Sequence, residues 1–303
     1  MADPNKPYTT PAWLKRGELV LDGALFRAPL SKDIETVLDI GSGTGTWAGD
    51  FAREFQQTQV IATDITPIMS INSVSNPNVT CLIEDAASTW SQPDNSVDYV
   101  HIRYLVGSIP DWDALFREAF RVLKPGGYVE SLEPSPSFQS DDGTVEEGSP
   151  LDQWGKMFNA GGRKIGRSFE VVGEDLQRKG IVNAGFESIV MTNFKVPISP
   201  WPKDKRLAEI GRCFQMTMEQ DVEGYVLFLF NSVMGWTVEE VEAYAADVLS
   251  QVHDETIHAY FWARNVYGQK PTRKPDADEG EGVSDGYVGK GSAGGEDSRD
   301  EED

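Results

Sequence analysis

The sequence predicts an α/β fold with a Rossmann-like, mostly parallel sheet of seven strands, helices on both faces and a helical lid. Short apolar runs alternate with helix-like patterns between residues 36 and 133, which is typical of parallel βαβ units. Several of these runs end in an acid, and a turn with three glycines follows the first of them. The acids and the turn therefore predict a ligand site at the carboxyl ends of the strands.

The glycine turn lies between a predicted strand at 36–40 and a predicted helix at 44–55. Gly41, Gly43 and Gly45 allow a tight turn and a close approach of a ligand to the backbone. The first amides of the following helix would face that ligand with a partial positive charge. The turn is thus expected to bind a nucleotide.

The remaining elements follow from apolar periodicity and from turn residues. Further strands are expected at 59–64, 79–83, 97–102, 128–132, 186–196 and 256–267. A helix is expected between Pro110 and Lys124, where Pro125-Gly126-Gly127 prevents it from continuing. Other helices are expected at 151–163, 170–182, 203–220, 222–234 and 237–253.

The chain divides into three regions by composition. Residues 1–34 form a lead-in, residues 35–271 the α/β domain, and residues 272–303 an acidic, glycine-rich tail that is expected to be disordered. Within the domain, 134–184 and 200–253 interrupt the strand-helix alternation. We expect these two insertions to form the lid above the strand ends.

Charge and cysteine content exclude several classes of protein. The net charge is −22, and residues 276–303 contribute −9 of it with 11 acids and two bases, so the rest carries −13. Such an acidic body is not expected to bind nucleic acid. Cys81 and Cys213 have no metal-type spacing, and no apolar run is long enough for a membrane span or a secretory signal. We expect a cytoplasmic protein, with the nucleus as an alternative, and no metal.

The spacing of the glycines argues against a dinucleotide. Asp39 and the three glycines form D-x-G-x-G-x-G, in which the third glycine comes one position earlier than in G-x-G-x-x-G. Asp39 is placed to meet a ligand amine or a bound water. Asp64, which ends the second strand, is placed to accept hydrogen bonds from ribose hydroxyls, and Asp85 from an adenine amine, with Glu84 as the competing acceptor. S-adenosylmethionine fits because it is an adenosyl cation without phosphates.

Five short segments resemble the class I S-adenosylmethionine-dependent methyltransferases, and most closely the fungal LaeA-like, or TAM-domain, methyltransferases of secondary metabolism. They are Gly43–Ala48, Asp64–Ile68, His101–Arg103, Gly107–Trp112 and Val122–Gly127. The likeness extends at lower strength to residue 271, and the lead-in before the glycine turn is shorter than in relatives. The resemblance implies cofactor contacts from Asp39, Gly41, Ser42, Gly43, Gly45, Trp47, Asp64, Ile65, Glu84, Asp85, Ala86 and Arg103.

Candidates for catalysis lie at the end of the fourth strand. His101 and Tyr104 are the groups closest to the expected methyl, and a hydroxyl acceptor would benefit from a base. His101 within a strand is also compatible with a histidine that only packs in the core.

The two lid segments are rich in aromatic and methionine residues, which can line an apolar pocket. They include Trp154, Phe158, Phe169, Phe214, Met216, Met218, Phe228, Phe230, Met234 and Trp236. We expect the substrate pocket to be lined by Tyr104, Trp154, Phe158, Phe214, Met218 and Met234. This composition favours a small, largely apolar acceptor.

The sequence therefore predicts methyl transfer to an oxygen, nitrogen or sulfur atom of a small metabolite, such as a secondary metabolite. Two alternatives remain open. The chain could act as a regulatory protein within a protein complex, as some members of the resembling family do. It could also be a cyclase or pericyclase that uses the cofactor as an electrostatic aid. The oligomeric state is not predicted.

Overall fold

The computed structural model describes residues 20–67 and 76–272. The first 19 residues of the expected lead-in and the expected tail from residue 273 lie outside these ranges. None of the described helices is long and apolar enough to cross a membrane.

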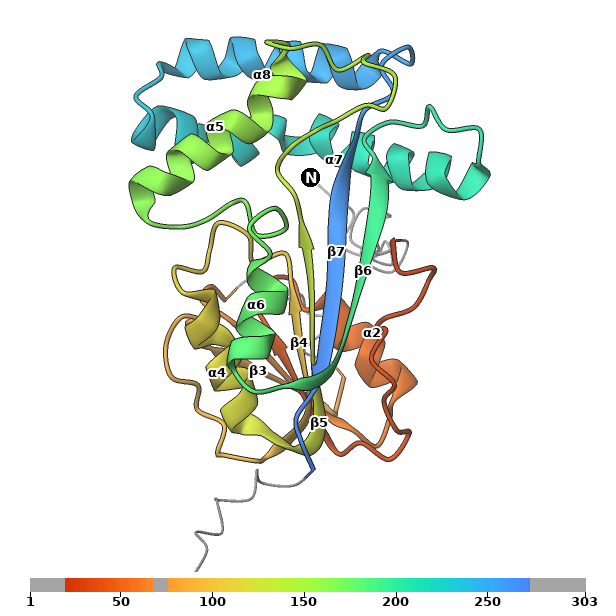
Figure 1. Ribbon diagram of the computed structural model, residues 1–303, viewed down its shortest axis with the longest axis vertical. Coiled ribbons are helices and arrows are strands. Elements are labelled where there is room, and N and C mark those ends of the chain that lie inside the picture. Colours follow the sequence, from red (N-terminus) through yellow and green to blue (C-terminus); the bar gives the residue numbers. More distant parts are fainter. Residues whose placement is uncertain (1–19, 68–75, 273–303) are drawn as a thin grey trace, which may run out of the picture. The chain divides into compact units, whose positions relative to one another are not determined.

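A seven-stranded sheet forms the centre of the domain, as predicted (Figure 1). The strands are β1 (Thr36–Ile40), β2 (Gln59–Asp64), β3 (Val79–Ile83), β4 (Val97–Arg103), β5 (Leu123–Pro134), β6 (Glu187–Pro197) and β7 (Tyr260–Gln269). Their order is β3-β2-β1-β4-β5-β7-β6. Strand β7 runs antiparallel to its two neighbours, β5 and β6, and the other neighbouring strands pair in parallel, so the sheet is mostly parallel. Helices of βαβ crossovers have to cover both faces of such a sheet.

Helix α2 (Thr46–Glu54) covers one face, and α4 (Trp112–Val122) and α6 (Leu176–Asn183) cover the other (Figure 1). Trp47 and Phe51 bury the apolar side of α2 against β1 and β2. Helix α4 begins at the predicted place, where the Asp111 side chain accepts a hydrogen bond from the backbone N–H of Ala114. Phe116 then packs in the core on that face.

The lid contains α5 (Pro150–Ile165), α7 (Lys205–Leu227), the π-helix η2 (Phe228–Val233) and α8 (Val238–His253). Figure 1 shows the lid helices gathered at one end of β5, β6 and β7. They share an apolar core of their own, in which Leu151, Phe230 and Val241 are fully buried. The lid comes from the two predicted insertions.

Several boundaries differ from the expected ones. Helix α6 begins at Leu176 instead of 170, because Asp175 has a left-handed backbone with a φ of 59°. The last strand begins at Tyr260 instead of 256, since the Asp254 carboxylate accepts hydrogen bonds from the N–H and hydroxyl of Thr256 in a turn. The break expected between the helices at 203–220 and 222–234 is confirmed, because α7 bends at Asp221, where the φ and ψ of −162° and 47° are not helical.

A buried carboxylate on β5 connects the lead-in to the sheet. Glu130 is 1% exposed and accepts hydrogen bonds from the backbone N–H groups of Arg27 and Ala28. The Tyr99 hydroxyl on β4 and the Asn265 amide on β7 also donate to it. Burial of a carboxylate is tolerated only when such donors surround it. Residues 27 and 28 are thereby fixed to the centre of the sheet.

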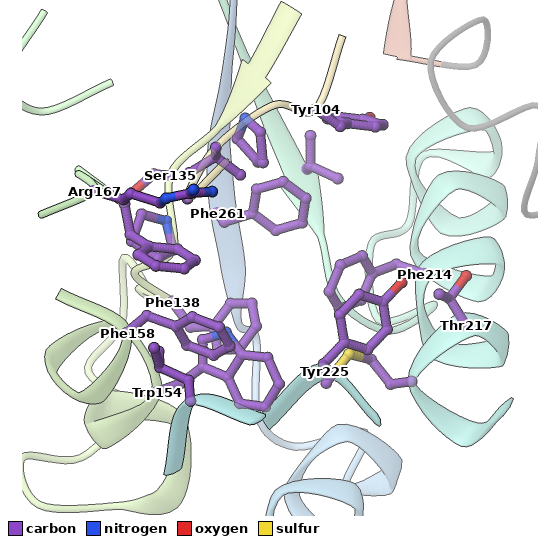
Figure 2. A pocket seen from close by; sticks show the side chains of 18 of the residues that line it. Tyr104, Ser135, Phe138, Trp154, Phe158, Arg167, Phe214, Thr217, Tyr225 and Phe261 are labelled. Carbon is purple, nitrogen blue, oxygen red and sulfur yellow. The ribbon is translucent and has the colours of Figure 1, made fainter. Parts of the chain in front are cut away.

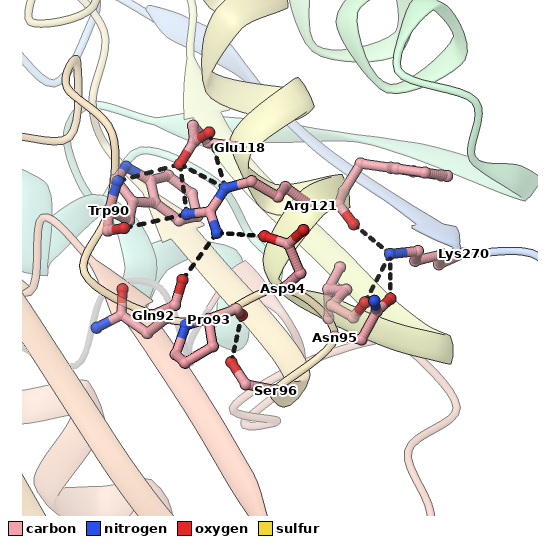
Figure 3. A network of polar contacts seen from close by, with 11 residues as sticks. Trp90, Gln92, Pro93, Asp94, Asn95, Ser96, Glu118, Arg121 and Lys270 are labelled. Carbon is pink, nitrogen blue, oxygen red and sulfur yellow. Dashed lines mark hydrogen bonds and ion pairs between the residues drawn. The ribbon is translucent and has the colours of Figure 1, made fainter.

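A polar network surrounds the C-terminal end of α4 (Figure 3). The Arg121 guanidinium donates to the carbonyls of Trp90 and Gln92 and pairs with Glu118 and Asp94. Lys270 lies beside it and donates from Nζ to the carbonyls of Phe120 and Leu123, at 2.6 and 2.8 Å, and to the Asn95 side chain. Lys270 thus satisfies carbonyls that the end of α4 leaves without helical partners.

We expect Lys270→Met to lower the free energy of unfolding by about 2 kcal/mol, because two helix-end carbonyls lose a charged donor. Urea unfolding followed by circular dichroism measures this difference. Lys32→Met, which replaces an exposed lysine, is the control and should leave stability unchanged. Equal midpoints for the Lys270 variant and the wild type would show that the network does not stabilise the helix end.

Candidate functional site

The glycine turn has the conformation that the sequence predicts. Gly41, Gly43 and Gly45 have φ values of 67°, 57° and 72°, in the left-handed region that glycine adopts without steric cost. The Ser42 N–H donates to the carbonyl of Thr63 on β2, which holds the turn against the second strand. Gly45 then forms the N-cap of α2.

Two of the glycines are required for different reasons. A Cβ added at Gly41 would collide with the Leu105 side chain, so this glycine allows the segment after β4 to approach. A Cβ added at Gly43 would meet nothing within 4 Å. The turn therefore has open space above Gly43, where a ligand can reach the backbone.

Asp39 is engaged by neighbouring side chains. It is 3% exposed. Its Oδ1 lies 2.7 Å from Nδ1 of His101, and its Oδ2 accepts a hydrogen bond of 2.6 Å from the Ser42 hydroxyl. The predicted contact of Asp39 with a ligand amine would need one of these oxygens to make a second hydrogen bond. In the structure, the carboxylate links β4 to the glycine turn.

His101 is buried beside the turn instead of facing the cavity described below. It is 3% exposed, and its ring stacks on Trp47 with ring centroids 3.7 Å apart. Burial lowers the pKa of His101 more strongly than the Asp39 hydrogen bond raises it, which favours the neutral ring. This geometry does not support the predicted role of His101 as a base. It agrees with the alternative of a packed histidine that orients Asp39.

Asp64 lies directly against the glycine turn. Its Oδ2 accepts a hydrogen bond of 2.8 Å from the Gly43 N–H, and its Oδ1 accepts from the N–H and hydroxyl of Thr66. Adjacent parallel strands β1 and β2 bring the two segments together. The acid of the second strand is therefore adjacent to the open space at Gly43.

The ends of β2 and β3 present exposed apolar side chains beside acids. Ile65 and Ile83 are 65% and 67% exposed, which is unusual for isoleucine at a strand end. Asp85 is exposed and uses Oδ1 to accept from the Ala87 N–H. Glu84 is half-buried, and its Oε2 is buried without a hydrogen-bond partner. This combination of carboxylates and apolar surface fits an adenosyl group.

The segment after β4 separates the turn from the lid. Tyr104 has a left-handed backbone with a φ of 59°, and its ring lies 5.8 Å from the guanidinium carbon of Arg103. Glu133 at the end of β5 accepts hydrogen bonds of 3.0 and 2.9 Å from the N–H groups of Leu105 and Val106. Because Glu133 is fully buried, desolvation raises its pKa to about 8, although these donors oppose the shift. Glu133 thus holds the segment in place.

A cavity of about 690 Å³ lies between this segment and the lid (Figure 2). Five of the six predicted pocket residues line it, namely Tyr104, Trp154, Phe158, Phe214 and Met218. Met234 was predicted wrongly, since it follows η2 and is not part of the lining. The π-helix directs Phe228 and Leu229 to the cavity instead.

Several lining residues were not selected from the sequence. They are Val20, Val106, Phe138, Ile165, Arg167, Thr217, Tyr225 and Phe261, among others. Phe169 packs so closely on Gly107 and Gly162 that a Cβ at either glycine would collide with its ring. A pattern of glycines that pack against an aromatic residue could have indicated this contact from the sequence. Arg167 lies in a loop, outside any periodic pattern, and the sequence did not indicate its position. Within residues 20–67 and 76–272, no cluster of three or more His, Cys, Asp or Glu could hold a metal ion.

Sequence comparisons identify the family. A family model described as a methyltransferase domain matches residues 12–177. Methyltransferase pytC from Aspergillus terreus is 33% identical over 253 residues, which cover 83% of this chain and 76% of that protein. The secondary metabolism regulator laeA from Aspergillus fumigatus is 29% identical over 78% of this chain and 62% of its own length. The chain thus spans less than two thirds of that regulator.

Solved structures with the same fold include a phosphoethanolamine N-methyltransferase from Haemonchus contortus in complex with S-adenosyl-L-methionine. Its TM-score is 0.51 at 22% identity, and the match covers 86% of this chain and 53% of that enzyme, so the chain spans about half its length. The cyclase SpnF matches with a TM-score of 0.50 at 19% identity, over 90% of this chain and 85% of its own.

The raised pKa of Glu133 predicts a pH-dependent stability. The folded pKa of about 8 lies above the ordinary value of 4.5, so the folded state binds more protons between these pH values. The contribution of this group is complete below about pH 4.5 and is lost as the pH rises to about 8. We expect Glu133→Gln to remove this pH dependence, which changes the free energy of unfolding by roughly 3–5 kcal/mol over the whole range.

Urea unfolding of both proteins at several pH values from 5 to 9 measures the slope. As the pH rises, the free energy of unfolding of the wild type should fall relative to that of Glu133→Gln. Glu255→Gln, at an exposed position, should keep the wild-type slope. Parallel curves for wild type and Glu133→Gln would mean that Glu133 does not titrate in this range.

Proposed function

The chain belongs to the S-adenosylmethionine-dependent methyltransferases, and we propose that it methylates a small, largely apolar metabolite. The accepting atom is an oxygen, nitrogen or sulfur. The observation that carries this proposal is the cavity of about 690 Å³, which has mostly apolar walls and adjoins the segment that packs on the glycine turn. Apolar clefts and cavities of this size are typical of small-molecule sites.

The cofactor is assigned to the open space at the glycine turn. When bound, S-adenosylmethionine supplies an activated methyl group on a sulfonium. Gly43 would leave room for its methionine part. The Asp64 carboxylate, which already accepts from the Gly43 N–H and from Thr66, would accept further hydrogen bonds from the ribose hydroxyls, and Asp85 would accept one from the adenine amine. The exposed side chains of Ile65 and Ile83 can cover the adenine faces, which gives their exposure a reason. Asp85 is preferred to Glu84 because its carboxylate is exposed.

The acceptor is assigned to the cavity under the lid. Residues 104–107 support this arrangement because Leu105 packs on Gly41 while Val106 and Gly107 line the cavity. One short segment would then separate the methyl donor from the acceptor, and its rigidity would fix their approach. Tyr104 lines the cavity and is better placed than His101 to contact the acceptor.

Partners and compartment follow from charge and cysteine content. The net charge of −22 favours a small-molecule acceptor over nucleic acid. Two cysteines without a disulfide agree with a reducing compartment such as the cytoplasm.

A cyclisation remains the second candidate, since a large apolar cavity also suits a rearrangement of a bound substrate and the cyclase SpnF shares the fold. A purely regulatory role would not require a cavity of this size. Cyclisation would continue when the methyl donor is replaced by S-adenosylhomocysteine, whereas methyl transfer would stop.

We expect Asp64→Ala to weaken binding of S-adenosylhomocysteine about 30- to 150-fold, because a carboxylate that accepts ligand hydroxyls contributes about 2–3 kcal/mol. Isothermal titration calorimetry measures the affinity. Asp247→Ala, at an exposed position on α8, is the matched control and should bind as the wild type does. Wild-type affinity in the Asp64 variant would refute this cofactor site.

The acceptor can be found by incubating the protein with a fungal metabolite extract and a donor that carries a deuterated methyl group. Mass spectrometry should detect a small product with the label. Label found only in protein, or in no compound at all, would contradict a small-molecule acceptor.

A further inference from the structure

Arg167 lies at the edge of the cavity, directly after α5. The helix ends at Gly166, whose left-handed backbone with a φ of 68° turns the chain toward the segment after β4. Nη1 of Arg167 donates a hydrogen bond of 2.8 Å to the carbonyl of Ser108. Arg167, Ser135 and Tyr104 all line the cavity (Figure 2). The side chain is therefore anchored by one nitrogen.

The charge of Arg167 is not neutralised by the part of the protein that the structure describes. The chain carries 49 acids and 27 bases, and arginines such as Arg121, Arg178 and Arg264 pair with carboxylates. Arg167 forms no ion pair within residues 20–67 and 76–272. Over the same residues, the cavity wall includes no aspartate or glutamate. In so acidic a protein, the cavity edge is thus locally positive.

Other polar groups on the cavity wall are also hydrogen-bond donors, or they already form hydrogen bonds within the protein. The Trp154 indole N–H has no acceptor among the described residues, although the side chain is 7% exposed. The Thr217 hydroxyl donates to the carbonyl of Cys213, one helical turn earlier. The Ser135 hydroxyl oxygen accepts from the Ser137 N–H. The Tyr225 hydroxyl on the wall can donate or accept. A bound methyl acceptor would therefore meet hydrogen-bond donors, and no carboxylate, on this wall.

We propose that Arg167 selects acceptors that carry a carboxylate, or a comparable anionic oxygen group, on an apolar body. Arg167 is an exposed residue at the cavity edge, and a guanidinium binds a carboxylate through two parallel hydrogen bonds. Nη2 and Nε of Arg167 make no hydrogen bond to the described residues and form such a fork. The aromatic wall accommodates the apolar body, whereas an ammonium would be repelled. This specificity rests on the proposed function of the cavity as the acceptor site.

The test compares two probes of the same shape, 2-naphthoate and its neutral amide 2-naphthamide. Titration calorimetry is carried out on the full chain saturated with S-adenosylhomocysteine. We expect the wild type to bind the carboxylate at least tenfold more tightly than the amide. Arg167→Gln should abolish this preference while keeping its affinity for the amide, and Arg167→Lys should restore part of it by restoring the charge.

Arg163→Gln is the matched control, because Arg163 is exposed in the last turn of α5 and is not part of the cavity lining. It should keep the tenfold preference. Equal affinity of the wild type for both probes would overturn the role of Arg167 but leave the acceptor site intact. If Arg167→Gln still preferred the carboxylate over the amide, the proposed role of Arg167 would be overturned as well. Failure of the wild type to bind either probe would refute the acceptor site itself, and the inference with it.

Discussion

The hydrogen bonds that surround the Glu130 carboxylate connect the parts on which the site depends. A carboxylate at 1% exposure is costly to bury, and here donors from the lead-in, β4 and β7 surround it while no described cation pairs with it. These donors lie up to 135 residues away from Glu130 in sequence. The lead-in is thereby placed so that the Leu25 carbonyl accepts from the Trp47 indole, and Trp47 in turn stacks on His101. The core of the sheet and the glycine turn therefore form one connected structure.

Strand β5 extends this connection from the sheet to the lid. Glu130 lies at its centre, Glu133 near its end holds the segment after β4, and Pro134 reaches the cavity. The same segment packs on Gly41 at its other side. A change in the conformation of residues 104–107 would consequently affect the proposed cofactor and acceptor sites together. The two sites are coupled through a backbone that both of them require.

The sequence sufficed for the sheet because its central parallel strands, such as β1 and β4, are buried on both faces and leave largely apolar runs. The glycine turn and Asp64 could be placed for a related reason, since carboxyl ends of neighbouring parallel strands meet at one edge. The lid was harder to predict. Its helices pack on one another, so an aromatic residue can face the lid core, as Phe230 does, or the cavity, as Phe228 does. A π-helix over residues 228–233 follows α7, which apolar periodicity does not predict, and Met234 directly after it is not part of the cavity wall.

The roles of individual polar residues depend on contacts between segments that are distant in the sequence. They could therefore not be predicted from local sequence patterns. Asp39 was expected to face a ligand, but His101, 62 residues away, occupies one of its oxygens. Glu133 and Arg167 each act on the segment between β4 and α4, although neither lies in a recognisable motif. Their positions follow from how the two insertions fold back over the sheet.

The place of β7 in the sheet constrains how the protein can fold during its synthesis. Residues 260–269 are translated after β5 and β6, yet they lie between these two strands and are antiparallel to both. Until they leave the ribosome, β5 and β6 have edges without partners, and the Glu130 carboxylate lacks its Asn265 donor. The lid insertions that precede β7 must also wait for it to close the sheet beneath them. A chain that stops before β7 therefore exposes unpaired edges of β5 and β6, which are a template for aggregation.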